Sequence, residues 1–345
     1  MKKDAQLTYE DDPHTDHKHL NRMLLLIVLI ILLLLISVWS LTRGAITVSL
    51  TEVWDSLQGL EESNMRKFLY EMRLPNVLIA IFGGMGLAAA GVILQRIMRH
   101  PLPDPGTVGM TGGGAFAVKL AVLYLTDLTI FQLFAVSTVG SIATSGMVWF
   151  LASRVKRGSM AIRSMFTGVL ILLIMTVSVR LIAKNTDQFR IGWNFSASSL
   201  GLPMFEWFIP WFAVGLIGAF WIIFARPATE PGRKRLMILS LIVVMELSVG
   251  VALAFGAIAF VGTVVPLLVR RWVGGEDRWV LPVSVILGAI LMVVISVVNR
   301  TLIAPMELPW NFIPSIVGAP IMIYLLCTYT VKEALVRKQQ RQTQQ

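Results

Sequence analysis

Ionisable side chains are scarce within the apolar stretches of this chain, and the few that occur there are the first candidates for chemistry. Glu246 and Lys119 each lie inside an apolar run, where a charged group is costly and is by default a functional candidate. For Glu246, a position near a helix end or an ion pair facing the bundle interior is an equal alternative. Lys119 lies near the end of its run, so an ammonium group that extends to the membrane surface is the simpler interpretation.

Residue patterns typical of catalysis are missing from the sequence. It has no GxxxxGK[ST] phosphate-binding loop, no HExxH zinc motif and no GxSxG motif with a partner histidine in a membrane segment. His14, His17 and His19 lie beside acidic residues and could bind a metal, but nothing apolar nearby would fix the ligand geometry, which favours a solvated tail. We therefore expect no catalytic residue, no metal site and no cofactor, and a membrane enzyme is poorly supported.

A proline-broken turn joins two apolar segments between Arg73 and Gly114. The turn contains Pro101, Pro103 and Pro105. Because lipid leaves no partner for an exposed backbone group, such a break must lie at a membrane surface, or be enclosed by protein or a water-filled cavity. The preceding segment, 83–91, is rich in glycine and alanine, which lets other helices approach its backbone closely. The pattern predicts two helices at the centre of a bundle, joined by a functional turn.

The composition places the whole chain in a membrane. Its 345 residues are 56% hydrophobic and only 14% charged, which is more apolar surface than a soluble domain of this length needs. The single cysteine, Cys327, excludes an internal disulfide framework. The net charge of +10 comes from short clusters between apolar runs, so it indicates membrane orientation and not nucleic-acid binding.

The predicted fold class is an all-α polytopic membrane protein with ten transmembrane helices. We expect a cytoplasmic polar tail at 1–22, a ten-span domain at 23–331 and a second cytoplasmic tail at 332–345. An amphipathic piece at 46–57 is expected to lie across the outer surface, and the run at 259–272 is short enough to be a broken or tilted helix. The ten apolar runs are 23–41, 75–95, 106–125, 130–152, 164–183, 205–225, 236–255, 259–272, 280–298 and 312–330.

The distribution of Lys and Arg predicts which side of the membrane holds the termini. With cytoplasmic termini, 21 Lys and Arg residues fall on the inner side, eight fall on the outer side, and Lys119 lies within a span. Inner loops carry the excess of Lys and Arg in membrane proteins. Both termini are therefore expected to be cytoplasmic. The lipid bilayer is itself an expected binding partner of the chain.

Three ordered motifs resemble a known family. The corner Arg73-Leu74-Pro75 is followed by a turn at 100–109 with the pattern polar-Pro-Leu-x-x-Pro-x-x-x-Gly. A second motif lies at 256–266 (GAIAFVGTVVP), and a third at 304–309 (APMELP) is followed by 316–321 (IVGAPI). Together they are similar to the FecCD-type permease family, which imports iron-siderophores, haem and vitamin B12 in bacterial ABC transporters.

The resemblance implies a fold and a set of partners. The fold would be that of a type II ABC importer permease, working as a homo- or heterodimer in the bacterial inner or plasma membrane. Cytoplasmic ATPase subunits would drive it, and an extracytoplasmic siderophore-binding protein would deliver a ferric siderophore. The alternatives keep this fold and change the cargo to haem or cobalamin. A non-transporting structural or regulatory partner is a third possibility.

Site residues carried over from the family fall into three groups. Arg73 and Arg300 match the positions that form ion pairs with the binding protein. His100, Pro101 and Leu102 match the inner gate near the pore axis, and Ala161 and Ile162 match its second element. Coupling to the ATPase is assigned to the basic residues between the sixth and seventh spans, Arg226, Arg233, Lys234 and Arg235.

The sequence departs from the family pattern at three places. Asn76 stands where a second arginine usually follows the Arg-Leu-Pro corner, and His100 replaces the usual asparagine. The segment 226–235 is brief and basic, whereas family members carry a longer loop with short coupling helices. Three explanations stay open: a reduced coupling surface, a partner permease with a complete loop, or impaired transport.

Overall fold

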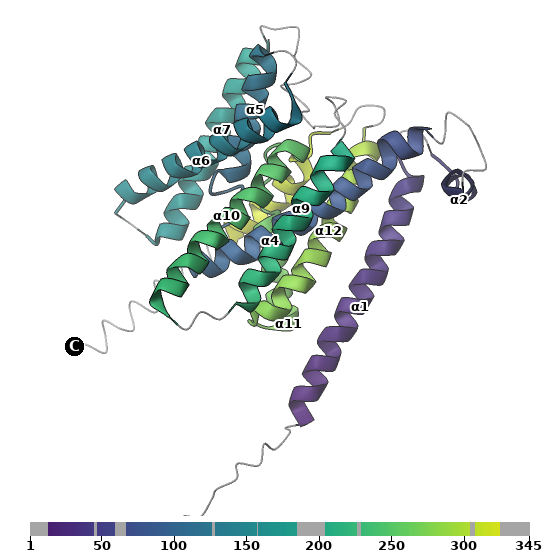
Figure 1. Cartoon of the computed structure of the whole chain (residues 1–345), viewed down its shortest axis with the longest axis horizontal. Helices are drawn as coiled ribbons and strands as arrows, with labels where there is room; N and C mark the ends of the chain where they lie inside the picture. Colours follow the sequence, from purple (N-terminus) through teal and green to yellow (C-terminus); the bar gives the residue numbers. More distant parts are fainter. Residues whose placement is uncertain are drawn as a thin grey trace, which may run out of the picture.

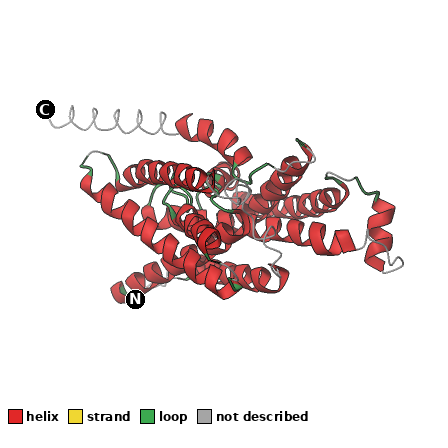
Figure 2. Ribbon diagram, turned by 90° about the horizontal axis from the view of Figure 1, so that it is seen from above, coloured by secondary structure: helices red, strands yellow, loops and turns green. Residues whose placement is uncertain are grey.

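The chain folds as a bundle of helices. The computed structural model describes residues 13–44, 47–58, 67–125, 128–156, 158–184, 204–225, 229–303 and 308–324, and every regular element in these ranges is helical (Figures 1 and 2). The elements are α1 (Pro13–Thr42), α2 (Leu50–Gln58), the π-helical turn η1 (Leu69–Arg73), α4 (Leu74–Met98), α5 (Met110–Tyr124), α6 (Ile130–Arg154), α7 (Met160–Lys184), α9 (Met204–Phe224), α10 (Glu230–Phe255), α11 (Val261–Val273), α12 (Asp277–Thr301) and a helix at Phe312–Tyr324.

The described helices confirm a multi-pass membrane protein. Seven of them are long and apolar enough to cross a bilayer, and they correspond to seven of the predicted runs. The remaining three runs form the shorter helices α5, α11 and Phe312–Tyr324. Ten transmembrane helices therefore stays a prediction.

Helices α4 and α12 form the centre of the bundle. In the most apolar stretch of α4, 78% of the residues are buried, against 11% in α1. α4 packs against α12, α10, α9 and α11. The contact between α4 and α12 is tight, because a Cβ on Gly288 would lie 2.5 Å from the Gly84 carbonyl oxygen. The small residues of α4 therefore serve close helix packing, as the sequence predicts.

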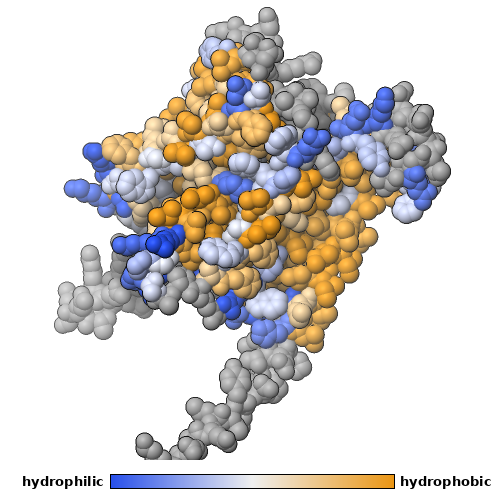
Figure 3. All heavy atoms as spheres, viewed as in Figure 1, coloured by the Kyte–Doolittle hydropathy of each residue, from blue (hydrophilic) through white to orange (hydrophobic). Residues whose placement is uncertain are grey.

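The other helices lie on opposite sides of this centre. α1 runs along one side against α12, and Figure 3 shows a continuous apolar surface over it. α5, α6 and α7 form a separate group on the other side (Figure 1). Within that group the Ser141 hydroxyl donates to the Met110 carbonyl at 2.8 Å, so α5 and α6 are joined by a buried hydrogen bond.

Two helix starts differ from the sequence prediction. α1 begins at Pro13, so the last part of the predicted tail, including His19, is helical instead of a solvated coil. The His19 ring lies 5.8 Å from the Trp279 ring, and this contact places it against α12. α10 begins at Glu230 and not at 236, because the Thr229 hydroxyl caps the helix by accepting from the Gly232 N–H at 3.3 Å.

α2 lies at the end of the bundle where α1 ends and α4 begins. Its Val53 is buried with Val48 and Leu69, and Leu41 of α1 packs against them. The amphipathic piece predicted at 46–57 thus forms a short helix, Leu50–Gln58. We call this end of the bundle the Arg73 end, and the opposite end, where α4 meets the proline-broken turn, the turn end.

Candidate gate at the turn end of α4

The proline-broken turn, residues 99–109, has a fixed backbone. It begins at Arg99 and ends at Gly109, and both have positive φ values, 49° and 89°. The His100 N–H donates to the Gln95 carbonyl at 3.2 Å, which ends α4. Inside the turn, Thr107 closes a loop, because its hydroxyl accepts from the Asp104 N–H at 3.2 Å and donates to the Asp104 carbonyl at 3.0 Å.

Asp104 fastens this turn to the segment before α11. Its side chain is fully buried, and Oδ2 accepts the Phe260 N–H at 2.9 Å. Phe260 has a φ of 74°, which is uncommon for a residue other than glycine. Burial raises the pKa of Asp104 to about 6, against the lowering effect of the Phe260 hydrogen bond. The carboxyl group therefore stabilises the strained backbone of Phe260. Burying the carboxylate away from water costs free energy.

Three further hydrogen bonds join residues 256–263 to the turn and to the two helices that flank it, α4 and α5. The Thr263 hydroxyl donates to the Leu102 carbonyl at 2.8 Å, and the Thr111 hydroxyl donates to the Ile258 carbonyl at 2.9 Å. The Gln95 side-chain amide donates to the Gly262 carbonyl at 3.4 Å. Residues 99–109 and 256–263 therefore form one hydrogen-bonded body, which we call the turn unit.

A small apolar cluster packs on the turn unit apart from the main core. It contains the buried residues Leu102, Met165 and Met322, with Phe260 and Leu267 packed against them. Leu102 comes from the turn, Met165 from α7 and Met322 from the helix Phe312–Tyr324. We call these five residues the gate cluster. Three segments far apart in the sequence thus meet at the predicted gate.

The predicted gate residues lie in the turn and in the first turns of α7, the helix whose Met165 packs with Leu102. Leu102 is fully buried, and His100 and Pro101 are half-buried beside it. Ala161 is buried and Ile162 is half-buried, in the turn of α7 that precedes Met165. α7 also docks on the turn at Gly168, where no Cβ would fit against the Thr107 carbonyl.

Sequence reasoning missed the residues that hold the turn and pack around Leu102. Asp104 was available as a signal, because it is a lone carboxylate between two prolines in an apolar setting. Phe260, Met165 and Met322 gave no signal, since each looks like an ordinary apolar residue of its segment. Only the fold places them around Leu102.

The two predicted docking arginines meet at the last turn of α1. The Arg73 side chain is buried, Nη1 donates to the Leu41 carbonyl at 2.5 Å, and its guanidinium lies 5.0 Å from the Phe68 ring. Arg300 is half-buried, and Nη2 donates to the Ser40 hydroxyl at 2.9 Å. Cations are favourable at a helix C-terminus, so both arginines stabilise the end of α1.

The predicted coupling residues lie on the first turns of α10. Arg233, Lys234 and Arg235 are exposed there, and Arg233 forms an ion pair with Glu230 at 2.9 Å. Arg226 lies outside the described residues. The predicted loop is therefore partly a helical extension of α10 that carries three basic side chains.

A charged network that the sequence did not predict ties the helices together at the same end. Asp277, at the start of α12, lies 2.8 Å from Arg270 of α11 and 3.8 Å from Arg96 of α4. Arg22 of α1 pairs with Glu276 at 3.0 Å. Because Arg96 lies one turn before the end of α4, this network adjoins the turn unit.

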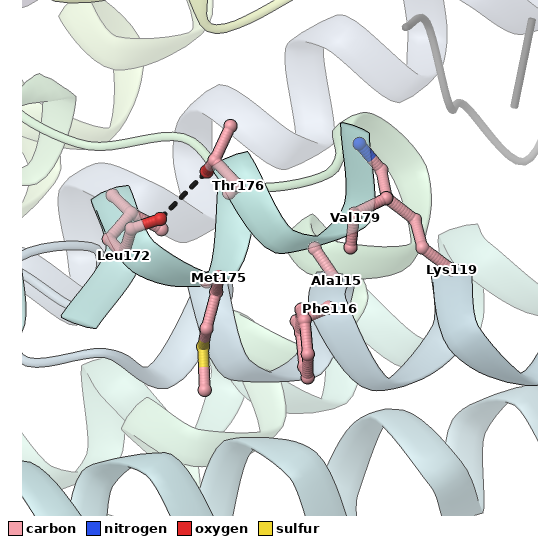
Figure 4. A pocket seen from close by; sticks show the side chains of 9 residues that line it. Ala115, Phe116, Lys119, Leu172, Met175, Thr176 and Val179 are labelled. Atoms are coloured by element: carbon pink, nitrogen blue, oxygen red, sulfur yellow. Dashed lines mark hydrogen bonds between the residues drawn. The ribbon is translucent and has the colours of Figure 1, made fainter. Parts of the chain in front are cut away.

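Glu246 and Lys119 lie away from the gate cluster. Glu246 faces α9, because a Cβ on Gly215 would clash with its carboxylate. Lys119 lines a small recess between α5 and α7 (Figure 4). Within the described ranges, no group of three His, Cys, Asp or Glu residues could hold a metal ion.

The fold and the turn unit define a class of protein: a multi-pass helical membrane protein whose central helix ends in a buried, hydrogen-bonded turn. The chain belongs to the FecCD transport family, whose model matches residues 29–328. It is a transporter subunit and not an enzyme.

Curated relatives match along most of their length. The hemin transport system permease protein HmuU of Yersinia pestis is 29% identical over 311 residues, covering 84% of this chain and 91% of the relative. The ferric enterobactin transport system permease protein FepG of Escherichia coli (strain K12) is 30% identical over 305 residues, with 84% and 91% covered. The Fe(3+)-citrate import system permease protein YfmE of Bacillus subtilis (strain 168) is 25% identical over 313 residues, with the same coverage.

A solved structure has the same fold. It is described as a metal-chelate type ABC transporter in an inward-facing conformation, and it aligns with a TM-score of 0.65 over 88% of this chain and 99% of that chain. The sequence identity is 22%. This similarity supports the arrangement of helices.

Proposed function

We propose that this chain is the membrane-spanning subunit of an ABC importer that carries a ferric siderophore into the cytoplasm of a bacterial cell. The observation that carries the proposal is the turn unit, in which a buried carboxylate and an apolar cluster close the end of the central helix. Several relatives are named for siderophores, among them ferric enterobactin and iron(3+)-hydroxamate permeases. Haem is the second candidate cargo, since HmuU is named for hemin.

The gate cluster would close the translocation path on its cytoplasmic side. Leu102 belongs to the turn and Met165 to α7, so a relative movement of the turn and α7 would separate them. The hydrogen bonds of Asp104 and Thr263 keep the turn unit in one piece, which favours movement as a body. The cargo would leave when ATP-driven movement opens this cluster, and a second permease subunit would supply the other half of the path.

Docking and coupling would use the two opposite ends. Arg300 and Arg73 lie at the Arg73 end, where a binding protein could offer carboxylates. Arg233, Lys234 and Arg235 lie at the other end, where an ATPase subunit would contact the start of α10. The excess of basic residues on that side supports a cytoplasmic position for it and for both termini.

Uptake of labelled iron by cells with and without this gene tests the proposal. We expect the deletion to abolish uptake of at least one ferric siderophore and to leave ferrous iron uptake unchanged. If the deletion impairs only haem or cobalamin uptake, the cargo is haem or cobalamin and not a ferric siderophore. Unchanged uptake of every chelate would favour a non-transporting partner.

Cross-linking tests the coupling surface. A photo-reactive group at Lys234 should capture an ATPase subunit in membranes. Capture only through a co-expressed second permease would indicate that the partner permease makes the coupling contact.

A further inference from the structure

Two neighbouring arginines at the end of α11 have different surroundings. Arg270 is half-buried, and its Nη2 lies 2.8 Å from the Asp277 carboxylate at the start of α12. Arg271 is exposed, and it takes part in none of the ion pairs formed between described residues. Trp272 beside it is 56% exposed. The last turn of α11 therefore presents a cation and a large aromatic ring on the outside of the bundle.

The same helix reaches the gate cluster. Its Leu267 packs on the buried members of that cluster, together with Phe260, the residue immediately before the helix. Leu267 and Arg271 are four residues apart, so they lie on the same face of α11, separated by about 6 Å along its axis. An exposed cation of α11 thus lies one helical turn from a side chain of the gate cluster.

The start of α11 is fastened to the turn. The Asp104 carboxylate accepts the Phe260 N–H at 2.9 Å, and the Thr263 hydroxyl donates to the Leu102 carbonyl at 2.8 Å. A carboxylate at the N-terminus of a helix is also favoured by the helix dipole. Asp104 and Thr263 are both fully buried, so water does not compete for these bonds. We therefore expect the start of α11 and the turn to move together.

The end of α11 is held more weakly. In the ion pair between Arg270 and Asp277, the two side chains are 24% and 25% exposed. Asp277 also lies 3.8 Å from Arg96 of α4, which offers the carboxylate a second cation. Partly exposed ion pairs contribute little to stability and can exchange partners. A displacement of the end of α11 therefore costs less free energy than its separation from the turn, and the turn would follow the helix.

The connection between α9 and α10 is short. α9 ends at Phe224 and α10 begins at Glu230, so residues 225–229 have no room for a helix of two turns, at about 3.6 residues per turn. Figure 1 shows the end of α9, the start of α10 and α11 at the end of the bundle that lies away from α2. A protein bound at this end therefore meets no helix projecting from this connection, whereas the last turn of α11 is exposed to it.

We propose that Arg271 and Trp272 form a contact surface for the ATPase subunit, and that movement of this subunit shifts α11 and opens the gate cluster. This inference rests on the proposed function and names a coupling contact outside the short α9–α10 connection. Arg and Trp are the side chains that most often dominate the binding energy of protein interfaces. Both also occur at membrane surfaces, where they contact lipid headgroups. The attachment of α11 to the turn favours the ATPase, because a static lipid contact supplies no movement to the gate.

The first test is photo-cross-linking in proteoliposomes that contain the complete importer with its ATPase and binding protein. A photo-reactive phenylalanine analogue in place of Trp272 should capture the ATPase subunit, identified by its mass. The same analogue in place of Leu268, which is exposed one turn earlier on α11, is the matched control and should capture lipid. Capture of lipid alone from position 272, or equal capture of the ATPase from both positions, overturns the inference.

The second test is charge reversal in the same proteoliposomes. Arg271→Glu should reduce both iron uptake and the ATPase activity stimulated by loaded binding protein about tenfold, as expected for an interface cation that becomes repulsive, while Arg271→Lys retains most of both. Lys156→Glu reverses an exposed cation between α6 and α7 and should change either rate less than about twofold. Unchanged rates in Arg271→Glu, or an equal loss in Lys156→Glu, overturn the inference. A wild-type chain that binds no ATPase subunit rejects the proposed function itself, whereas normal ATPase binding without capture from position 272 rejects only the contact at α11.

Discussion

The two ends of α4 are held in different ways. At the Arg73 end, Arg73 of η1 and Arg300 of α12 each attach to the last turn of α1, a helix with a mostly exposed apolar surface. At the turn end, buried hydrogen bonds and an apolar cluster join the turn, the segment before α11, α7 and the helix Phe312–Tyr324. One end is therefore held by two arginines that contact a single helix, and the other by a network that joins four segments of the chain.

Among the tests of this difference between the two ends, replacing Asp104 at the turn end should have the largest effect. Asp104→Leu leaves the part-buried Phe260 N–H without its acceptor and should destabilise the turn unit by about 2–4 kcal/mol, given the cost of an unsatisfied donor and of the strained backbone that the carboxylate holds. The measurement is the thermal unfolding midpoint in detergent, together with ATPase activity without cargo. Asp104→Asn keeps an acceptor oxygen and is the matched control. Equal behaviour of both variants would contradict the role of the Phe260 hydrogen bond.

Shortening the gate cluster should have the next largest effect. Met165→Ala removes a buried side chain that packs on Leu102 and should cost about 2–4 kcal/mol. We expect higher ATPase activity without cargo, because the gate closes less well. Leu173→Ala changes an exposed residue of the same helix and should be nearly neutral. If both variants behave alike, the cluster has no gating role.

Reversing the charge of Arg300, a proposed docking residue, should have a moderate effect. Arg300→Glu should weaken binding of the extracytoplasmic protein about tenfold, since a half-buried charge contact becomes repulsive. Arg43→Glu changes an exposed cation at the end of α1 and should weaken the binding of this protein less than Arg300→Glu does. The measurement is binding-protein affinity for the purified importer while the ATPase subunits remain attached. Unchanged affinity in Arg300→Glu would show that Arg300 does not take part in docking.

A pH change acts on the same carboxylate without removing its hydrogen bond. The pKa of Asp104 is raised to about 6 by burial, whereas an unfolded Asp titrates near about 4. Between these values the folded chain binds more protons, so its free energy of unfolding should fall as the pH rises through this window. We expect a higher unfolding midpoint at mildly acidic than at neutral pH, and Asp104→Asn should reduce that difference. The same pH dependence in the variant would assign it to another group.

Much of this fold follows from local sequence patterns. Apolar run lengths predicted the long helices, and the small residues of α4 predicted its central position, which the Gly84–Gly288 contact confirms. The start of α10 was also readable, because Thr229 is a helix-capping residue and Pro231 suits a first helical turn. The prediction at 236 followed hydrophobicity alone and missed both signals.

The turn unit could be predicted only in part. Prolines and the Arg-Leu-Pro corner identified the turn, and the family resemblance is confirmed over residues 29–328. The partners of the turn could not be predicted, because Asp104 and Phe260 are far apart in sequence and Phe260 adopts its positive φ only in that contact. The burial of Arg73 could not be predicted either, since a surface arginine and one that caps α1 look the same in sequence.

The most direct test is to lock the gate cluster. In a Cys327→Ser background, Leu102→Cys and Met165→Cys would be joined by a short thiol-reactive cross-linker in the complete importer. We predict that the cross-link stops iron uptake while binding-protein docking persists, and that a cleavable linker restores uptake when it is reduced. Uptake at the wild-type rate with the cross-link in place would show that the turn end of α4 is not the gate.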